Sequence, residues 1–278
     1  MVDYIPGELV YYAHRLSPEF RELLIVPIAD AHYGNPLFSE THFARLLNYI
    51  KMHDNCYAVC MGDLCDAVLS SSIGNIYEQK VTPPEQRNKM IEWLSPIADR
   101  ILGMVGGNHE ARIYKATGID ITKDISNTLH VPYRQEGIML KVSFGSGNSR
   151  HLDKPYSYFI YCNHGYGGAR TKAAKAVKVE RLATFIHADA YLMAHDHDVN
   201  VATAIYLQPD PRTALDTRTG FTVGKVVAHS KMLIKVNSYI KWGGYGETGG
   251  FAPVSLRFPV IRLSGEGRKD ITVEVSSG

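Results

Sequence analysis

The sequence predicts a single α/β domain in which two β-sheets pack face to face with helices outside. Up to about residue 105, continuous apolar runs alternate with amphipathic helical segments, the pattern of buried parallel strands joined by crossover helices. From about residue 136, apolar and polar residues alternate, which is typical of half-buried antiparallel strands. The 278 residues suit one large domain. We therefore expect one domain over 1–278, with a motif-bearing core at 21–200 and a C-terminal β-rich completion at 201–278.

In the first part of the chain, three strands and two helices are predicted after an irregular, aromatic-rich arm. The arm covers residues 1–20, the strands 23–29, 56–61 and 101–105, and the helices 39–53 and 82–95. The strands are continuous apolar runs, as expected when both faces are covered. Phe43 and Ile50 belong to an apolar stripe with helical spacing. Thr82 and Glu85 have the spacing of a capping box, which marks a helix start.

The second part of the chain predicts short helical pieces and then mostly β-structure. The helical pieces lie at 110–130 with a break at Gly118. A further helix is predicted at 172–187, and strands are predicted at 140–144, 156–162, 189–193, 226–240, 254–263 and 271–275. Because apolar and polar residues alternate here, we expect these strands to be mostly antiparallel.

The composition excludes several classes of protein. Hydrophobic residues make up 45% and charged residues 21% of the chain, values typical of globular proteins. The net charge of +2 is too small to indicate nucleic acid by itself. No run approaches the ~20 apolar residues of a membrane span, and no signal-peptide pattern is seen. The four cysteines match no common zinc spacing, so we expect reduced, buried thiols and a cytoplasmic protein.

Polar side chains with ligand chemistry follow five of the predicted strands. They are Asp30 and His32, Asp63 and Asp66, Asn108 and His109, His164, and His195 and His197. In open α/β sheets, ligands bind beyond the carboxyl ends of the strands. We therefore expect the five groups to converge on one site. Gly106 and Gly107 are expected to let the backbone turn sharply there and approach a ligand closely.

Imidazole and carboxylate ligands together suit Mn²⁺, Fe or Zn²⁺. One ion takes about four protein ligands or fewer. The candidates are more numerous: Asp30, His32, Asp63, Asn108, His164, His195 and His197. The surplus predicts two divalent ions that share a bridging carboxylate and clamp a phosphoryl group. Any one of these motifs alone is more often a turn or an incidental pair, but five of them directly after strand-like runs favour a metal site.

The motif set resembles that of the calcineurin-like metallophosphoesterases over residues 30–197. The matching motifs are Asp30-Ala31-His32, Gly62-Asp63-Leu64-Cys65-Asp66, Gly107-Asn108-His109-Glu110, His164, and Ala194-His195-Asp196-His197. Ala194 stands where the family has glycine, which removes no ligand. The resemblance implies a four-layer α/β/β/α sandwich of two packed mixed sheets flanked by helices.

The resemblance also implies a role for each motif residue. The first metal would be held by Asp30, His32 and His197, the second by Asn108, His164 and His195, and Asp63 would bridge them. A metal-bound hydroxide would attack phosphorus, with His109 stabilising the transition state or protonating the leaving oxygen. Asp66 would orient His109. Mn²⁺ is the metal we expect, with Fe, Zn²⁺ or Ni²⁺ as alternatives.

The motif spelling favours a phosphodiesterase, nuclease-like, acting on DNA or RNA. The Gly-Asp-Leu-Cys-Asp spelling is similar to the diesterase and DNA-repair nuclease branches, and the length and Gly-rich C-terminal part to phage- or prophage-encoded members, which would act in the host cytoplasm. Ser/Thr protein phosphatases have arginines where this chain has Ala67 and Gly106, which disfavours that activity. The predicted substrate contacts are Tyr33, Tyr166, Arg170 and Lys172.

Two questions stay open at the level of sequence. The basic residues Arg170, Lys172, Lys175, Lys178 and Arg181 lie in or just before a predicted helix, which would hold a nucleic-acid backbone or be a solvated face. The alternative substrates are a small nucleotide or another phosphoester. A scaffold protein on the same fold is the non-enzymatic alternative, although scaffolds typically lose ligands that are all present here. The oligomeric state is not indicated.

Overall fold

The computed structural model describes residues 7–70, 72, 74–148 and 154–276. The strands are β1 (Tyr11–Arg15), β2 (Glu22–Ile28), β3 (Cys56–Cys60), β4 (Ile101–Val105), β5 (Tyr133–Arg134), β6 (Gly137–Phe144), β7 (Gly147–Asn148), β8 (Tyr156–Asn163), β9 (Ala190–Met193), β10 (Asn200–Leu215), β11 (Thr222–Lys235), β12 (Pro259–Ser264), β13 (Glu266–Gly267) and β14 (Ile271–Val275). The helices are α1 (Glu40–Met52), α2 (Pro83–Leu94), α3 (Asn108–Thr117), α4 (Ile121–Leu129), α5 (Lys172–Phe185) and α6 (Tyr245–Thr248), with short 3₁₀ helices at Ile76–Glu78 and Ser95–Arg100.

The strands form two six-stranded mixed sheets. The first has the order β14-β12-β2-β3-β4-β5, and the second has the order β1-β6-β8-β9-β11-β10. In the first sheet β2, β3 and β4 run parallel, whereas β12 pairs antiparallel with β2. In the second sheet β1 runs parallel to β6, β8 to β9 and β9 to β11, whereas β6 pairs antiparallel with β8 and β10 with β11. The expectation of mostly antiparallel strands in this part of the chain was therefore wrong for this sheet. The metal-ligand motifs therefore follow parallel strands in both sheets.

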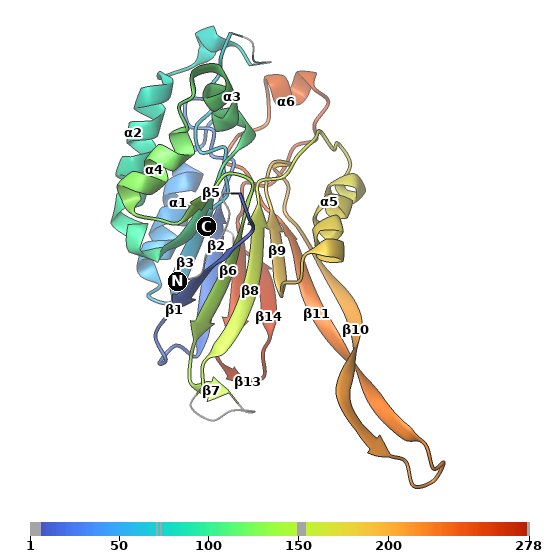
Figure 1. Cartoon of the computed structure of the whole chain (residues 1–278). Helices are drawn as coiled ribbons and strands as arrows, with labels where there is room; N and C mark the ends of the chain where they lie inside the picture. Colours follow the sequence, from blue (N-terminus) through green and yellow to red (C-terminus); the bar gives the residue numbers. More distant parts are fainter. Residues whose placement is uncertain (1–6, 71, 73, 149–153, 277–278) are drawn as a thin grey trace.

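Three hydrophobic layers hold four layers of secondary structure together. Phe43 and Leu46 belong to a cluster between the helices α1–α4 and the first sheet. Leu140 and Ile160 belong to a second cluster, which fills the space between the sheets. Val179 of α5 belongs to a third cluster on the outer face of the second sheet. Figure 1 shows α1–α4 on one side of the molecule and α5 on the other. The predicted four-layer sandwich is confirmed.

Local sequence signals explain several element boundaries. The Thr82 backbone N–H donates to Glu85 Oε2 over 2.8 Å, so the predicted capping box forms at the start of α2. Gly118 separates α3 from α4 with φ of 77°, a left-handed conformation that glycine adopts without strain. Pro27 lies in β2 beyond the last residue that pairs with β12, so its missing N–H costs no ladder hydrogen bond.

Other parts of the sequence prediction were also wrong. The expected irregular arm contains β1, which pairs parallel with β6; residues 1–6 lie outside the described residues. β10 was not predicted, because its many exposed positions and two prolines lack the alternation of a half-buried strand. β10 and β11 form a long hairpin that projects beyond the rest of the molecule (Figure 1).

All four cysteines are free and buried, as predicted. No helix among the described residues is long and apolar enough to cross a membrane.

Candidate metal centre

The five predicted motifs lie beyond the carboxyl ends of β2, β3, β4, β8 and β9. Three of these strands belong to the first sheet and two to the second, so the motifs meet where the ends of both sheets come together. Ligand atoms of Asp30, His32 and His197 lie within 4.8 Å of one another, and so do those of Asp63, His164 and His195. Six of the seven predicted ligands therefore form two clusters.

The first cluster leaves a buried carboxylate oxygen without a hydrogen-bond donor. His32 Nε2 lies 3.1 Å from His197 Nε2, and His197 Nε2 lies 3.5 Å from Asp30 Oδ1. Among the described residues, nothing donates a hydrogen bond to this buried Asp30 oxygen. An unpaired buried carboxylate oxygen is costly, and a cation shared with the two rings would remove that cost.

The second cluster contains Asn108 as well. Asp63 Oδ2 lies 3.2 Å from His164 Nε2. The Asn108 side-chain oxygen lies 2.9 Å from His164 Nε2 and 2.8 Å from His195 Nδ1. With the amide in this orientation, four lone-pair atoms face one point, which is the arrangement a cation requires. The opposite orientation of the amide would instead place N–H donors there.

Asp63 lies between the two clusters. Its Oδ2 atom is 3.2 Å from His164 Nε2 in the second cluster and 3.8 Å from His32 Nε2 in the first. One carboxylate oxygen thus faces both clusters, the position expected of a bridging ligand. The residues present therefore fit two divalent cations that share Asp63.

Hydrogen bonds on the far side of each ring direct the ligand nitrogens inward. His164 Nδ1 donates to the Met61 carbonyl over 2.7 Å, and His195 Nε2 donates to the Gly167 carbonyl. His32 Nδ1 lies 3.3 Å from Asp66 Oδ1. Because a carbonyl oxygen only accepts, the proton of His164 and of His195 is fixed on the outer nitrogen, and the inner nitrogen keeps its lone pair.

Backbone N–H groups hold the two carboxylates in the same way. The His195 N–H donates to Asp30 Oδ2 over 2.9 Å, and the His109 N–H donates to Asp63 Oδ1 over 2.8 Å. Each carboxylate therefore has one oxygen fixed by the backbone of another loop and one oxygen turned toward the clusters.

The field of the buried carboxylates favours positive charge at this site. Burial opposes the charged form of His164, but Asp63 raises the pKa of that ring to about 10. Burial likewise opposes charge on His32, but Asp66 and Asp63 raise its pKa to about 9. The same field that favours a proton on these rings favours a divalent cation between them.

Five of the seven predicted ligands have left-handed backbone conformations. Their φ angles are 47° at Asp30, 48° at His32, 50° at Asp63, 71° at His195 and 57° at His197. Non-glycine residues rarely adopt such angles, and each costs of the order of 1–3 kcal/mol. The loops thus hold the ligands in conformations that an isolated chain would avoid.

Gly62 and Gly107 allow two of these loops to touch. A Cβ atom on Gly107 would lie 2.0 Å from the Asp63 nitrogen, and one on Gly62 would lie 2.5 Å from the Gly107 nitrogen. The lack of a side chain at Gly107 therefore lets the backbone approach the Asp63 loop closely. The predicted approach of Gly106 and Gly107 to a ligand stays a prediction.

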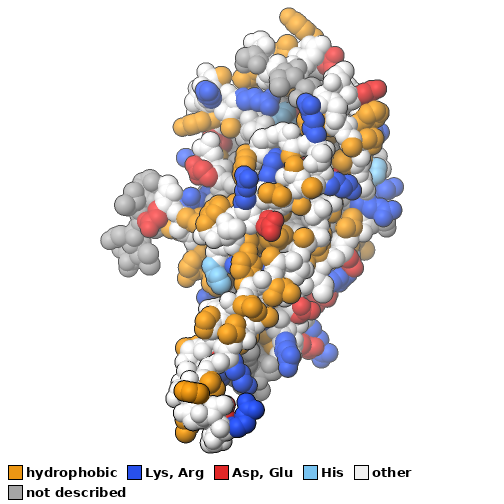
Figure 2. Space-filling model, turned by 90° about the vertical axis from the view of Figure 1, so that its right-hand side faces the viewer, with side chains coloured by type: hydrophobic (Ala, Val, Ile, Leu, Met, Phe, Trp, Pro, Cys, Tyr) orange, Lys and Arg blue, Asp and Glu red, His pale blue; other side chains and the backbone are white. Residues whose placement is uncertain are grey.

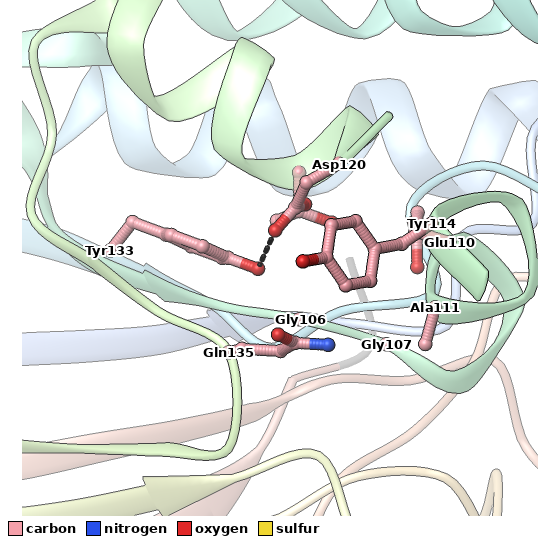
Figure 3. Close-up of a pocket in the computed structure, with 9 residues that line it drawn as sticks. Gly106, Gly107, Glu110, Ala111, Tyr114, Asp120, Tyr133 and Gln135 are labelled. Carbon is pink, nitrogen blue, oxygen red and sulfur yellow. Dashed lines mark hydrogen bonds between the residues drawn. The ribbon is translucent and has the colours of Figure 1, made fainter. Parts of the chain in front are cut away.

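Glu110 fastens the same two loops. Its carboxylate accepts the Asp63 N–H over 3.0 Å and the Cys65 N–H over 2.9 Å. Burial, together with the charge of Asp63, raises the pKa of Glu110 to about 7. Figure 3 shows Glu110 on the wall of a small cavity that lies behind the Gly106–Gly107 turn, beside the hydrogen bond from Tyr133 to Asp120. No predicted metal ligand lines this cavity.

Asp66 contacts both His109 and His32. His109 Nδ1 donates to the Asp66 backbone carbonyl over 2.6 Å, so Asp66 orients this ring through its main chain. The Asp66 carboxylate lies 3.3 Å from His32 Nδ1 and 3.5 Å from His109 Nδ1. The sequence linked Asp66 to His109 alone, whereas the structure places its carboxylate slightly closer to a predicted metal ligand.

The predicted substrate contacts fall into two groups. The ring of Tyr33 packs 4.9 Å from that of Trp93, within an aromatic cluster of the helical layer. Tyr166, Arg170 and Lys172 are exposed in and after the loop that follows β8. The guanidinium of Arg170 lies 5.5 Å from the ring of Phe251. Three of the four candidates therefore remain accessible, and packing occupies the Tyr33 side chain.

The basic helix corrects the sequence analysis at two positions. Lys178 Nζ lies 2.7 Å from Asp196 Oδ1, and buried Lys175 lies 3.4 Å from Asp198 Oδ2. Both lysines are therefore paired within the fold. They form neither the solvated face nor the phosphate-binding face that the sequence analysis considered. Their partners alternate with His195 and His197 along the chain, so α5 supports the loop that carries two predicted ligands.

Lys235 is a supporting residue that the sequence analysis missed. It is fully buried, its Nζ atom lies 2.7 Å from Asp196 Oδ2, and it donates to the Ala194 carbonyl over 2.7 Å. Asp196 is thus held between Lys235 and Lys178, directly between the ligands His195 and His197. Nothing in the sequence marked Lys235, because the end of β11 reaches this loop only in the folded chain.

Arg112 was missed as well. It lies one turn after Asn108 in α3, and its Nη2 atom is 3.2 Å from the Asn108 amide nitrogen. No ion pair joins Arg112 to a carboxylate of the described residues. The helical spacing from Asn108 and His109 was the signal that could have identified it.

No family model and no curated protein matches the chain. Solved structures do match it. Vacuolar Protein Sorting 29 from Cryptosporidium parvum is 14% identical, with 93% of this chain and 100% of that chain covered and a TM-score of 0.43. The calcineurin-like phosphoesterase YfkN from Bacillus subtilis is 12% identical, with 91% and 90% covered and a TM-score of 0.46. Pseudomonas putida nuclease MPE is 12% identical, with 90% and 87% covered and a TM-score of 0.37.

These likenesses are too distant to support any statement about activity. The four-layer architecture and the convergence of the motif residues agree with what the motif resemblance implied.

We expect Asp63→Asn to weaken both metal positions together, because one Asp63 oxygen faces both clusters. Asp30→Asn is the matched control and should weaken one position, since Asp30 Oδ1 faces a single cluster. Metal content per chain after dialysis, measured by native mass spectrometry, checks both variants. Loss of one ion from Asp63→Asn would contradict the bridging position.

We expect Lys235→Met to lower the free energy of unfolding by about 3 kcal/mol, since breaking a buried ion pair costs this much. The same variant should bind metal more weakly, because the loop with His195 and His197 loses a fixed contact. Lys172→Met, on the exposed start of α5, is the control. Denaturant unfolding and metal titration test the two effects, and unchanged metal affinity in Lys235→Met would show that the contact serves stability alone.

Proposed function

We propose that this protein is a dimetal-dependent phosphodiesterase that acts on nucleic acid, with Mn²⁺ as its preferred metal. The single observation that carries the proposal is the Asp63 oxygen that faces both ligand clusters. When bound, two divalent ions would supply an activated water and neutralise charge on the phosphoryl oxygens. The complete ligand set argues against a scaffold that has lost its metals.

His109 is proposed to assist the leaving group. Its Nδ1–H is held by the Asp66 carbonyl, so its Nε2 faces the centre, 3.9 Å from Asp63 Oδ2. Burial lowers the pKa of His109 to about 4, which keeps the ring neutral at pH 7. The negative charge of a bound phosphodiester works in the opposite direction, so substrate binding favours uptake of a proton from solvent by Nε2, and this proton can then pass to the leaving oxygen.

Arg112 is proposed to bind the phosphate. With the Asn108 oxygen turned toward the ligand cluster, the neighbour of the Arg112 guanidinium is an amide nitrogen, which cannot accept a hydrogen bond. The donors of the guanidinium therefore remain available for the oxygens of a phosphodiester. Protein phosphatases have phosphate-binding arginines at the positions of Ala67 and Gly106. In this chain Arg112 would provide the positive charge instead.

Exposed residues beside the centre favour a polymer over a small nucleotide. Tyr166 is 50% exposed, and Arg170 and Lys172 are exposed in the same region. A base can stack on tyrosine, and arginine and lysine can contact neighbouring phosphates. Hydrolysis of a small nucleotide is the alternative. A small nucleotide would need no contacts from Tyr166, Arg170 or Lys172 to neighbouring bases and phosphates.

We expect His109→Ala to retain both metals and to lose ~100-fold in diester hydrolysis, the contribution of a general acid. The substrates are single-stranded DNA, duplex DNA, RNA, cyclic nucleotides, a phosphopeptide, and a chromogenic diester and monoester, each with Mn²⁺. His187→Ala, on the exposed surface, is the control. Full turnover by His109→Ala would remove this residue from the mechanism, and no turnover of any substrate by the metal-loaded protein would favour the scaffold.

We expect Arg112→Ala to lower kcat/KM for nucleic acid by ~10- to 100-fold, since a hydrogen bond to a charged group contributes about 1.5–3 kcal/mol. Arg112→Lys should recover part of the loss, because it keeps the charge without the planar donor pair. Metal content should stay unchanged in both variants. Unaltered kcat/KM in Arg112→Ala would contradict phosphate binding by this residue.

A further inference from the structure

The hairpin of β10 and β11 leaves the second sheet and continues alone. β11 pairs with β9 only over Met232–Lys235, whereas β10 and β11 pair with each other out to Leu215 and Thr222. The arm, residues 204–230, is therefore a two-stranded ribbon beyond the sheet (Figure 1). A two-stranded ribbon is at best marginally stable in water without a packing partner.

The two faces of the arm differ. The pairing register places Ile205, Leu207, Pro209, Val226, Ala228 and Ser230 on one side, which we call the apolar face. Ile205 is 66% exposed, Leu207 71% and Val226 61%. The opposite side carries Gln208, Val227 and His229, and at its base Tyr206 covers the ammonium of Lys231. Figure 2 shows hydrophobic side chains along the projecting hairpin.

The apolar face continues the core between the two sheets. Ile234 lies on the same side of the ribbon and is fully buried in that core, and Met232 packs against it. Farther along the ribbon the first sheet no longer covers this side, and the apolar residues become exposed. The apolar pattern of the core therefore continues along the arm, where no described residue of this chain covers it.

The edge of the arm is protected against strand addition. β10 is the edge strand, and its Pro209 and Pro211 have no N–H group to offer. The register also shifts between Pro209 and Thr213. Prolines and irregular register hinder edge-to-edge pairing, so a partner would pack on the face of the ribbon.

We propose that the apolar face packs against the same face of a second copy of this chain. The face has no charged side chain, so a like face meets it without repulsion or an unpaired buried charge. Nucleic acid would gain little on this face, because the face itself offers no cation. Lys225 precedes Val226 and so lies on the opposite side of β11. Arg218 lies in the turn at the tip, and Arg212 is paired with Asp210. A two-fold contact sets each apolar residue against the same set in the partner.

The size of the arm sets the expected strength of the dimer. Twelve residues at ~3.3 Å each, in a ribbon ~10 Å wide, give a footprint of about 400 Å². A standard interface buries about 800 Å² per partner. The exposed Leu215 and Phe221 near the tip would extend the contact onto the partner's arm. We therefore expect a reversible dimer whose population depends on concentration.

Sedimentation velocity of the full chain from about 1 to 100 µM, the range of weak complexes, tests this proposal. We expect concentration-dependent dimers in the wild type and monomers in Val226→Asp. Val227→Asp is the matched control, since the neighbouring valine lies on the opposite side and should leave the dimer intact. Circular dichroism checks that both variants are folded.

Three outcomes would overturn the proposal. These are a wild type that stays monomeric throughout the range, equal dissociation by both valine variants, and a dimer unaffected by Val226→Asp. Metal content and diester hydrolysis are measured in parallel. A Val226→Asp variant that loses the dimer but keeps its metal and its turnover shows that the dimer contact and the proposed hydrolysis are independent.

Discussion

The hydrogen bond from the His195 N–H to Asp30 Oδ2 is the interaction on which the centre depends. Asp30 follows β2 in the first sheet and His195 follows β9 in the second, so this bond joins the ends of the two sheets. It also leaves the other Asp30 oxygen buried and without a hydrogen-bond donor among the described residues. This contact therefore joins the two sheets at the site and leaves one buried carboxylate oxygen that a cation would satisfy.

The sequence predicted the ligand set because its signals are local. An apolar run followed by aspartate, asparagine or histidine can be read directly, and the carboxyl ends of parallel strands meet for topological reasons. The supporting contacts are not local. Lys235 reaches Asp196 across 39 residues of sequence, and Glu110 reaches Asp63 across 47. No periodicity marks such pairs, so only the folded chain could identify them.

The basic helix shows why composition alone was a poor guide to binding. Its lysines have the spacing of a charged face, yet Lys175 and Lys178 are paired with aspartates of the ligand loop. The acidic partners Asp196 and Asp198 lie next to predicted ligand histidines, and no pattern in the sequence distinguished their role from that of the histidines. Charge that is neutralised within the fold cannot attract a polyanion, so Arg170, Lys172 and Arg181 are the exposed cations that remain of this basic stretch.

The left-handed conformations of the predicted ligands give a physical reason to expect metal ions at this site. Five such residues cost of the order of 1–3 kcal/mol each, which is comparable in sum to the whole stability of a typical domain. Glu110, Lys235 and the Gly62–Gly107 contact hold this strain in place. Backbone strain at buried histidines and aspartates would not improve a protein-binding surface. It does serve metal binding, because the ligands of two cations must converge with their lone pairs directed inward.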